Sequence, residues 1–316
     1  MTLPSEICWS PQPLWGVPEN LPEGVRWVFG SLPESAYPDV VAMILNGSDG
    51  QFDGNRLAQF PNLRVISSYG IGYDHIDAAY AGDHGITVTH TPDAVTISTA
   101  EMAVALLLAL IREIPAYHAQ ATKAGKVLTG SSTGLSLELF GKSVGLVGYG
   151  RIGQRLVRLL EPFGVTIHYT RAHGPHPDAR DRWQPLTTLL PGSDVVILAV
   201  PSTPETYHLL DRTKIATMKS GSLLVNVGRG PVIDEEALVR ALDLGHIRGV
   251  ALDVFEDEPI IHSGLLNRPN VVLSPHRGTS TYETRVRMTE AAMENVVCAL
   301  AGHPIHLIPG SSQRTS

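Results

Sequence analysis

The segment from residue 143 to residue 160 constrains the fold more than any other part of the chain. A short apolar run, SVGLV, leads into the glycine triplet Gly148-Tyr149-Gly150-Arg151-Ile152-Gly153, and a helical pattern follows through Leu160. In this context the first glycine permits a tight turn, the second lets backbone approach a pyrophosphate, and the third permits close packing of helix on strand. The open amides of the helix N-terminus then face phosphate groups. The segment therefore predicts a dinucleotide-binding unit.

Strand-like and helix-like patterns alternate along the rest of the chain. Short apolar, β-branched runs recur at residues 40–45, 64–67, 86–89, 144–147, 165–169, 194–200, 223–227, 250–253 and 271–273. Runs that are apolar on both faces and separated by helical patterns indicate parallel sheets covered by helices. The fold class is therefore α/β. We also predict that Ser98 and Glu101 form a capping box at the start of a buried helix, and that Asp234 caps a helix ended by Gly245.

Composition and charge exclude several classes of protein. The chain has 316 residues, 43% of them hydrophobic, and a net charge of −7 without any run of Lys and Arg, which argues against a nucleic-acid partner. The longest apolar run, 102–111, falls short of the roughly 20 residues that a membrane span needs. No export signal is visible at the N-terminus, so we expect a cytoplasmic protein. Cys8 and Cys298 provide no framework of bridges or metal ligands.

The strand after the glycine triplet ends in Tyr169-Thr170-Arg171, where a ribose-binding carboxylate is expected. An acidic residue about 20 positions after the triplet would bind the ribose 2′-hydroxyl of NAD and repel a 2′-phosphate. Thr170 removes that repulsion, and Arg171 offers a planar donor fork for a phosphate. We therefore predict that NADP(H) is preferred, with NAD(H) as an alternative cofactor. The alternative interpretation is that Arg171 is a solvated surface residue and binds no phosphate. His173 and His176 are interpreted as a solvated turn, and no metal is predicted.

Three other strand-like runs end in residues with catalytic chemistry: Arg229 in NVGRG, Glu258 in VFEDEP and His276 in SPHRG. Ligands of open parallel sheets bind outside the carboxyl ends of the strands, so these side chains should meet at one crevice. As hydride reaches a carbonyl carbon, charge grows on oxygen, and His276 is suited to donate the proton. Glu258 would favour the imidazolium, and Arg229 can fork onto a substrate carboxylate. Taken singly, His276 also fits a core histidine, Glu258 an acidic residue of a turn, and Arg229 a surface cation.

Five motifs together resemble one known family. NVGRG, ALDVFEDEP and LSPHRG, with ISSYGIGYDHID and THTPDAVTISTAE upstream, look like the D-isomer-specific 2-hydroxyacid dehydrogenases, and more closely the glyoxylate and hydroxypyruvate reductases among them. The resemblance spans roughly residues 38 to 308. It implies a Rossmann-type doubly wound dinucleotide-binding domain at residues 99–284 and a smaller, flavodoxin-like substrate-binding domain made of residues 1–98 and 285–316. It also implies a homodimer.

The same resemblance assigns roles residue by residue. It makes Arg229 the substrate-binding catalytic arginine, Glu258 the partner of the histidine, and His276 the proton donor. Asp253 would contact the nicotinamide carboxamide and Thr99 the nicotinamide side. The loop Tyr69-Gly70-Ile71-Gly72 would offer backbone amides to a substrate carboxylate. Further cofactor contacts are expected at neighbouring strand ends, from Val200, Pro201, Val227 and Gly228.

The chain departs from the family pattern at a few positions. Arg277 stands where an aliphatic residue is common, and no tryptophan soon follows the stretch 124–127, so details of a dimer arm are open. Glu258, rather than the glutamine of related formate dehydrogenases, argues against formate as substrate. We expect NADPH-preferring reduction of small 2-oxo acids such as glyoxylate or hydroxypyruvate. Phosphite oxidation and a non-catalytic, corepressor-like nucleotide sensor remain as alternatives.

Overall fold

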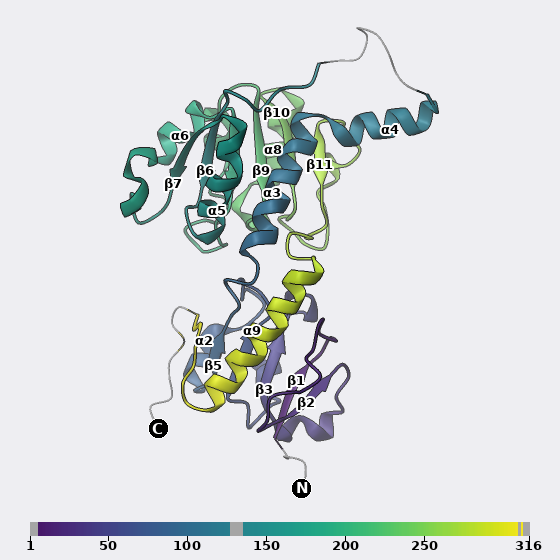
Figure 1. The fold of residues 1–316 in the computed structure, drawn as a ribbon, viewed down its shortest axis with the longest axis vertical. Helices are drawn as coiled ribbons and strands as arrows, with labels where there is room; N and C mark the ends of the chain where they lie inside the picture. The colour runs from purple at the N-terminus through teal and green to yellow at the C-terminus, as the bar shows by residue number, and fades with distance from the viewer. Residues whose placement is uncertain (1–5, 127–134, 309–310, 312–316) are drawn as a thin grey trace. The chain divides into compact units, whose positions relative to one another are not determined.

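The computed structural model describes residues 6–126, 135–308 and 311. The chain divides into two compact units, one made of residues 1–95 and 279–316 and the other of residues 96–278. Each unit contains its own parallel β-sheet (Figure 1). No described helix is long and apolar enough to cross a membrane.

The first unit is built on a five-stranded sheet in the order β2-β1-β3-β4-β5. Its strands are β1 (Ile7–Ser10), β2 (Arg26–Phe29), β3 (Val40–Leu45), β4 (Val65–Ser68) and β5 (Thr87–Thr89). All four neighbouring pairs are parallel. This strand order, 2-1-3-4-5, is that of flavodoxin-like folds, as predicted. Strands β1 and β2 were not predicted, because ICWS and RWVF are short and show neither alternation nor a β-branched run.

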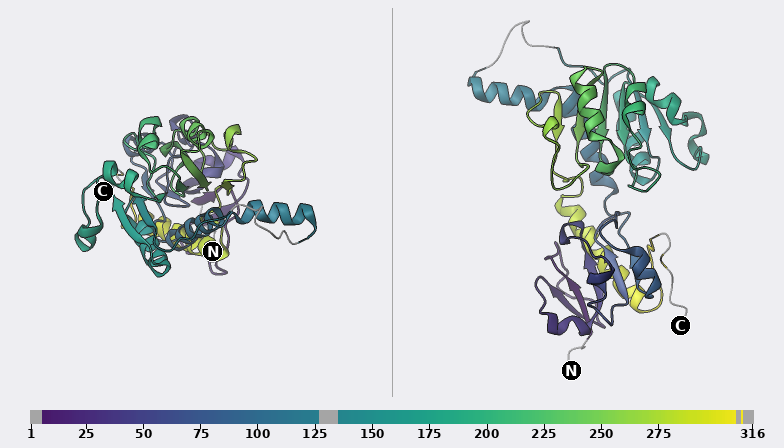
Figure 2. Two further views of the ribbon diagram at one scale, coloured as in Figure 1. Left: turned by 90° about the horizontal axis from the view of Figure 1, so that it is seen from above. Right: turned by 180° about the vertical axis from the view of Figure 1, so that it is seen from behind.

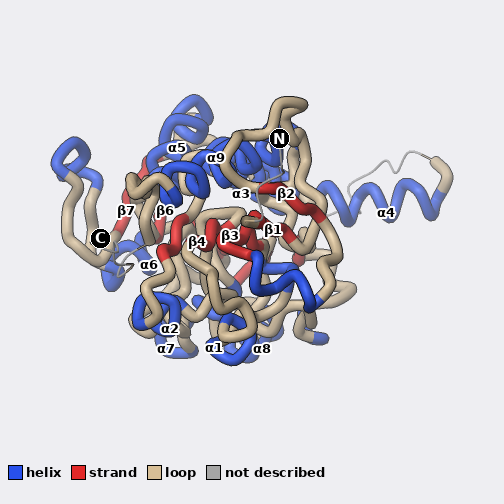
Figure 3. The backbone as a smooth tube through the Cα atoms, turned by 90° about the horizontal axis from the view of Figure 1, so that it is seen from below, coloured by secondary structure: helices blue, strands red, loops and turns tan. Residues whose placement is uncertain are grey.

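Helices cover both faces of this sheet. The helices are α1 (Gly54–Leu57), α2 (Ala78–Asp83) and α9 (Tyr282–Leu300). Apolar residues of α9, including Met288 and Val296, pack with Val41 and Val65 from one face of the sheet. The opposite face packs with Leu57 and the residues around α1 and α2. Figure 3 shows the strands of this unit between α9 on one side and α1 and α2 on the other.

The second unit is built on a six-stranded parallel sheet in the order β11-β10-β9-β8-β6-β7. Its strands are β6 (Ser143–Val147), β7 (Thr166–Thr170), β8 (Val195–Leu198), β9 (Ser222–Asn226), β10 (Ile247–Leu252) and β11 (Val271–Leu273). The chain runs outward from β6 to β7 and then returns to build β8 to β11 on the other side of β6. The predicted doubly wound α/β fold is therefore confirmed, with its topological switch point at β6.

Two helical layers enclose this second sheet. The α-helices are α3 (Thr96–Ile111), α4 (Ile114–Ala124), α5 (Arg151–Leu160), α6 (Leu186–Gly192), α7 (Arg212–Thr217) and α8 (Glu235–Asp243). Short 3₁₀ turns complete the two units: η1 (Glu34–Asp39), η2 (Gly47–Asp49), η3 (Glu161–Phe163), η4 (Pro177–Arg182), η5 (Gly230–Val232) and η6 (Ser263–Leu265). Helices α3 and α5 pack on one face, and α6, α7 and α8 on the other. Figure 1 faces the α3 and α5 layer, and the right-hand view of Figure 2 faces the α8 layer.

The structure tests the two predicted helix caps. Asp234 caps α8 as expected, because its carboxylate accepts a hydrogen bond from the Ala237 amide at 2.8 Å. The capping box at Ser98 and Glu101 is wrong, because α3 already begins at Thr96. Ser98 lies inside the first turn of α3 and is buried there, so it is a helical residue and not the N-cap.

Candidate active site

The carboxyl ends of the six strands of the second unit lie in register. The paired residues across the sheet are Thr170 with Val147, Val147 with Leu198, Leu198 with Asn226, Asn226 with Leu252, and Leu252 with Leu273. Because the strands are parallel, the loops that follow these residues all leave from the same edge. Those loops carry the glycine triplet and the residues Arg171, Arg229, Asp253, Glu258 and His276.

The glycine triplet forms an open turn between β6 and α5. Gly148 has a φ of +106°, and a Cβ atom there would lie 2.5 Å from the Ala199 carbonyl oxygen, so only glycine fits. Gly150 is the N-cap of α5 and supplies no side-chain cap to the helix amides. A Cβ on Gly150 would meet no atom within 4 Å. An uncapped helix N-terminus beside open space fits the pyrophosphate of a dinucleotide.

The segment after β7 folds back beside the glycine turn. Arg171 Nε donates to the Gly174 carbonyl at 2.9 Å, and within the described residues Arg171 forms no ion pair. The ring of Tyr149 stacks on Tyr169 with centroids 3.8 Å apart, and the Tyr169 hydroxyl accepts from the His176 amide at 2.6 Å. These contacts fasten the segment from Arg171 to His176 next to the glycine turn, where an adenosine ribose phosphate would lie.

His276 and Glu258 form a hydrogen-bonded pair at the ends of β11 and β10. The distance from His276 Nδ1 to Glu258 Oε2 is 2.8 Å. Since a carboxylate only accepts, Nδ1 carries a hydrogen, and Nε2 is left to face a ligand. The imidazole is 45% exposed, so a ligand and solvent can reach it. His276 has a φ of +52°, which is uncommon for a residue other than glycine, and its amide donates to the Asp253 carbonyl at 2.8 Å.

The surroundings of Glu258 favour its charged form. Burial by itself would raise the pKa of Glu258. The net pKa is nevertheless lowered, because the carboxylate is stabilised by the hydrogen bond and charge of His276, by the Phe255 amide and by the Arg229 charge. The Phe255 amide donates to Glu258 Oε1 at 3.0 Å. The carboxylate is therefore ionised at neutral pH and can stabilise an imidazolium at His276.

Arg229 stands in the loop after β9. Buried Asn226 holds this loop, since its Nδ2 donates to the Arg229 carbonyl at 2.9 Å and its Oδ1 accepts from the Gly228 amide at 3.0 Å. Arg229 itself is half-buried, and its charge contributes to the lowered pKa of Glu258. The structure therefore brings Arg229, Glu258 and His276 to one edge of the second sheet.

Asp253 anchors a neighbouring loop, a role that the sequence did not predict. Its carboxylate is buried, and its two oxygens accept hydrogen bonds from the amides of Arg277 and Gly278 at 2.8 and 2.7 Å. Asp253 thereby anchors the loop that carries His276. Thr99 of α3 lies at the same place, because a Cβ on Gly278 would be 3.9 Å from the Thr99 methyl group. Of the other expected cofactor contacts, Val200 lies against Gly228, whose Cβ would be 2.6 Å from the Val200 carbonyl oxygen.

The loop Tyr69-Gly70-Ile71-Gly72 follows β4 in the first unit. The Tyr69 side chain is buried, and its hydroxyl donates to the Arg285 carbonyl of α9 at 2.8 Å, so the phenol is directed into the core of its own unit. The Gly70 amide is bound to the Ser68 carbonyl at 3.0 Å. The amides of Ile71 and Gly72 have no hydrogen-bond partner in the described part of the chain. These two amides are the groups of this loop that can meet an anion.

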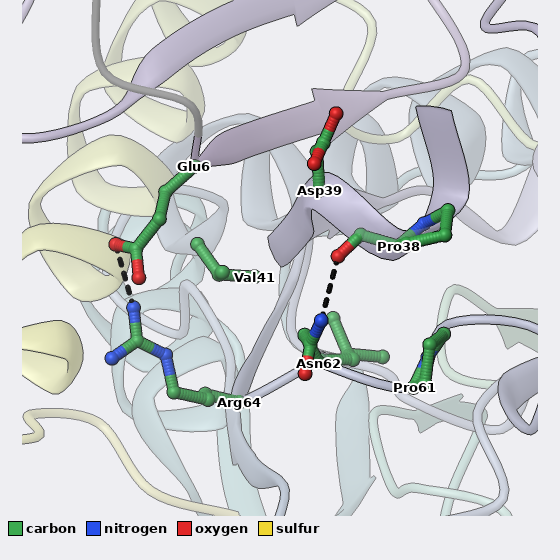
Figure 4. Close-up of a pocket in the computed structure, with 8 residues that line it drawn as sticks. Glu6, Pro38, Asp39, Val41, Pro61, Asn62 and Arg64 are labelled. Carbon is green, nitrogen blue, oxygen red and sulfur yellow. Dashed lines mark hydrogen bonds and ion pairs between the residues drawn. The ribbon is translucent and has the colours of Figure 1, made fainter. Parts of the chain in front are cut away.

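A cavity of about 410 Å³ opens elsewhere in the first unit (Figure 4). It is lined by Glu6, Pro38, Asp39, Val41, Pro61, Asn62, Leu63 and Arg64. These residues lie at the amino ends of β1, β3 and β4, the edge opposite to the Tyr69 loop. Arg64 is paired with Glu6 at 2.8 Å, and ligands of such sheets bind at the carboxyl ends, so we assign no site to this cavity.

The fold places a glycine turn, Arg229 and the His276–Glu258 pair at the carboxyl edge of one parallel sheet. Residues 104–278 match the family model "D-isomer specific 2-hydroxyacid dehydrogenase, NAD binding domain". Over 267 residues the chain is 38% identical to glyoxylate reductase of Thermococcus gammatolerans, covering 82% of this chain and 79% of the relative. It is 39% identical to glyoxylate/hydroxypyruvate reductase B of Serratia proteamaculans, covering 81% of this chain and 80% of the relative.

Solved structures show the same relationship. The NADPH-dependent glyoxylate/hydroxypyruvate reductase of Sinorhizobium meliloti, in complex with NADP and malonate, is 32% identical, with a TM-score of 0.88 and 99% of both chains covered. The chain belongs to the D-isomer-specific 2-hydroxyacid dehydrogenase family and is an oxidoreductase. The family predicted from the five motifs is thereby confirmed.

Proposed function

We propose that this enzyme reduces small 2-oxo acids, such as glyoxylate and hydroxypyruvate, to 2-hydroxy acids, with NADPH preferred over NADH. The observation that supports this most directly is the 2.8 Å contact of His276 Nδ1 with Glu258 Oε2, at the sheet edge where Arg229 also lies. Relatives named glyoxylate reductase and glyoxylate/hydroxypyruvate reductase B support the substrate class. Phosphite oxidation gains no specific support from these relatives.

The residues around the glycine turn fit a nicotinamide dinucleotide. The bound cofactor would supply the hydride. The N-terminus of α5 and the Gly150 backbone would receive the pyrophosphate, and the Arg171 guanidinium the 2′-phosphate. The remaining contacts would come from Thr99, Thr170, Val200, Pro201, Val227, Gly228 and Asp253. The NADP complex of the Sinorhizobium meliloti relative supports the cofactor preference.

The protein's own groups would bind the substrate and move one proton. Arg229 would fork onto the substrate carboxylate and polarise the carbonyl. The loop of Ile71 and Gly72 would contribute to substrate binding through its two open amides. As the carbonyl oxygen gains charge, His276 Nε2 would donate its proton to that oxygen. The product then contains one added hydride and one added proton. Glu258 would hold the ring and favour the imidazolium until solvent recharges the exposed imidazole.

We also propose that the enzyme works in the cytoplasm as a homodimer. Large apolar side chains are exposed between residues 114 and 140: Ile114 at 54%, Leu135 at 89% and Phe140 at 76%. A contiguous exposed apolar surface is a common interface, and these three side chains are the candidates for one here. Light scattering after size-exclusion chromatography measures the mass directly, and a monomer at micromolar concentration would refute the dimer.

A substrate and cofactor panel tests the proposed reaction. Initial rates are measured with glyoxylate, hydroxypyruvate, pyruvate and phenylpyruvate, each with NADPH and NADH, and with phosphite and NADP⁺. We expect the highest kcat/KM for glyoxylate or hydroxypyruvate with NADPH. A higher kcat/KM with NADH would refute the cofactor preference, and turnover of phosphite alone would refute the substrate class. Tight NADPH binding without any turnover would indicate a nucleotide sensor.

A further inference from the structure

His208 and Glu256 form a contact that the mechanism above does not use. His208 Nε2 donates to Glu256 Oε1 at 2.5 Å, and the two side chains are 29% and 20% exposed. Glu256 lies two residues before Glu258. His208 comes from the segment between β8 and α7, whose proposed cofactor contacts, Val200 and Pro201, lie near its start. The contact therefore ties a distant segment to the loop of the catalytic carboxylate.

His208 also holds the loop of Arg229. Its amide donates to the carbonyl of Pro231, two residues after Arg229, at 2.8 Å. The φ of His208 is +45°, a conformation that residues other than glycine seldom adopt and that persists only where surrounding contacts hold it. One residue thus contacts the Arg229 loop through its backbone and the Glu258 loop through its side chain.

Glu256 is fixed a second time at the start of α8. Its Oε2 accepts from the Glu235 amide at 3.0 Å, and its own amide donates to Glu235 Oε1 at 3.0 Å. Glu235 is only 4% exposed. We call His208, Glu256 and Glu235 the clamp. Its three side chains and two backbone amides hold the Glu256 backbone against the start of α8.

The peptide bond between Phe255 and Glu256 links the clamp to the reacting groups. A Cβ on Gly230 would lie 1.8 Å from the Phe255 carbonyl carbon and oxygen, so the residue after Arg229 packs directly on this peptide. The amide of Phe255 donates to Glu258 Oε1, and Glu258 Oε2 contacts His276 Nδ1. A shift of this peptide would therefore move Arg229 and Glu258 relative to His276.

We propose that His208 and Glu256 are positioning residues of the reaction, which hold Glu258 against His276 and set its spacing from Arg229. This inference rests on the proposed function. A purely structural role would lower stability and leave the rate per folded enzyme unchanged. A positioning role lowers kcat, because small displacements of reacting groups slow the chemical step. It also moves the alkaline limb of the kcat profile to lower pH, because a displaced Glu258 favours the imidazolium less.

The test compares one variant that breaks the clamp with one that keeps its geometry. His208→Asn suits the left-handed backbone, since Asn tolerates positive φ, but is too short to reach Glu256. Glu256→Gln keeps an oxygen that accepts from the Glu235 amide, and its NH₂ group can donate to His208 Nε2 when the ring carries its hydrogen on Nδ1, so it should retain the geometry. Glu236→Gln is the matched control, because Glu236 is the next residue of α8, is 58% exposed and pairs with Arg240 at 2.8 Å.

Steady-state rates with glyoxylate and NADPH are measured from pH 5 to 10, below the melting temperature of each variant. For His208→Asn we expect kcat to fall between about tenfold and about a hundredfold, with the alkaline limb at lower pH and the NADPH Kd within about twofold. Glu256→Gln and Glu236→Gln should stay near wild type in kcat. An unchanged kcat and pH profile in His208→Asn would overturn the proposal. So would a loss of kcat matched by an equal loss of NADPH affinity.

A second readout separates this inference from the proposed function. If the wild-type enzyme reduces none of the 2-oxo acids, the proposed function fails, yet the clamp can still be measured. Histidine ring signals are followed by NMR at one pH, and the His276 signal is assigned from its loss in His276→Gln. We expect the Nδ1 hydrogen of His276 to exchange with water faster in His208→Asn than in wild type, because its contact with Glu258 Oε2 is weakened. Identical exchange rates would overturn the clamp whatever the substrate.

Discussion

Replacing Glu258 by Gln removes the charge beside His276 while keeping a side chain of the same shape. In the structure Glu258 accepts from the Phe255 amide with Oε1 and from His276 Nδ1 with Oε2. In the variant the side-chain oxygen of Gln can still accept from the Phe255 amide, and the NH₂ group then faces His276 Nδ1. Nδ1 must then be unprotonated, so the variant favours a neutral ring. Proton donation from an imidazolium becomes rarer at neutral pH.

The size of the effect follows from the contact and its exposure. A hydrogen bond to a charged group contributes about 1.5–3 kcal/mol. The His276 and Glu258 side chains are 45% and 36% exposed, so solvent screening places this pair at the lower end of that range. About 1.4 kcal/mol corresponds to a factor of about ten. We therefore expect kcat at pH 7 to fall about tenfold, with little change in NADPH affinity.

The contact between Glu258 and His276 also predicts how stability and kcat change with pH. The pKa of Glu258 is lowered below the ordinary value of 4.5, so its charge and its contribution to folding are present above pH 4.5 and are lost as pH falls through the lowered pKa. The variant should lose rate mainly at the alkaline side, where the imidazolium is needed. Asp257→Asn, a change at the exposed neighbouring acid, is the control. A Glu258→Gln enzyme with wild-type kcat and an unshifted alkaline limb would refute the assignment.

Three further changes test other parts of the structure. Arg171→Ala should raise the KM for NADPH by about tenfold or more, because a charged hydrogen bond to the 2′-phosphate is lost, and should leave the KM for NADH unchanged. Equal effects on both cofactors in rate assays would contradict this. Burial raises the pKa of Glu235, and the nearby Glu256 charge adds to this despite the hydrogen bond from the Glu256 amide. Folding stability therefore declines as pH rises through that raised pKa. Glu235→Gln should have a higher melting temperature than wild type at pH 8, and the two melting temperatures should agree below pH 4.5. Gly148→Ala should weaken NADPH binding in fluorescence titrations and lower the melting temperature, because its Cβ would lie 2.5 Å from the Ala199 carbonyl oxygen; wild-type affinity would contradict the tight turn.

The sequence predicts strands well where the chain is buried on both faces. β3 is buried at all six positions, and its run of Val, Ala, Met, Ile and Leu is legible without the structure. β1 is equally buried but consists of Ile, Cys, Trp and Ser over four residues, so neither period nor β-branched content distinguishes it from a loop. Its place in the sheet comes from pairing with β3, a tertiary contact that no local pattern contains.

The candidate site is legible for a different reason. Arg229, Glu258 and His276 each follow a predicted strand within a few residues, and parallel strands place such residues at one edge. The clamp could not be predicted in this way. His208 and Glu256 are 48 residues apart, and Glu235 and Glu256 are 21 apart, with no shared motif or period to connect them. Side chains that fix a loop through contacts of this kind are visible only once the strands are in register.

The loop of His276 also shows how the chain accommodates Arg277, where the family resemblance leads us to expect an aliphatic residue. Asp253 holds this loop through backbone amides, at residue 277 and at Gly278, while the Arg277 side chain is exposed. A backbone amide is the same for every residue except proline, so the anchor does not depend on the side chain at 277. Gly278 is different, because a Cβ there would lie 2.7 Å from Asp253 Oδ2. Asp253 and Gly278 therefore hold the His276 loop, and neither contact involves the side chain of Arg277.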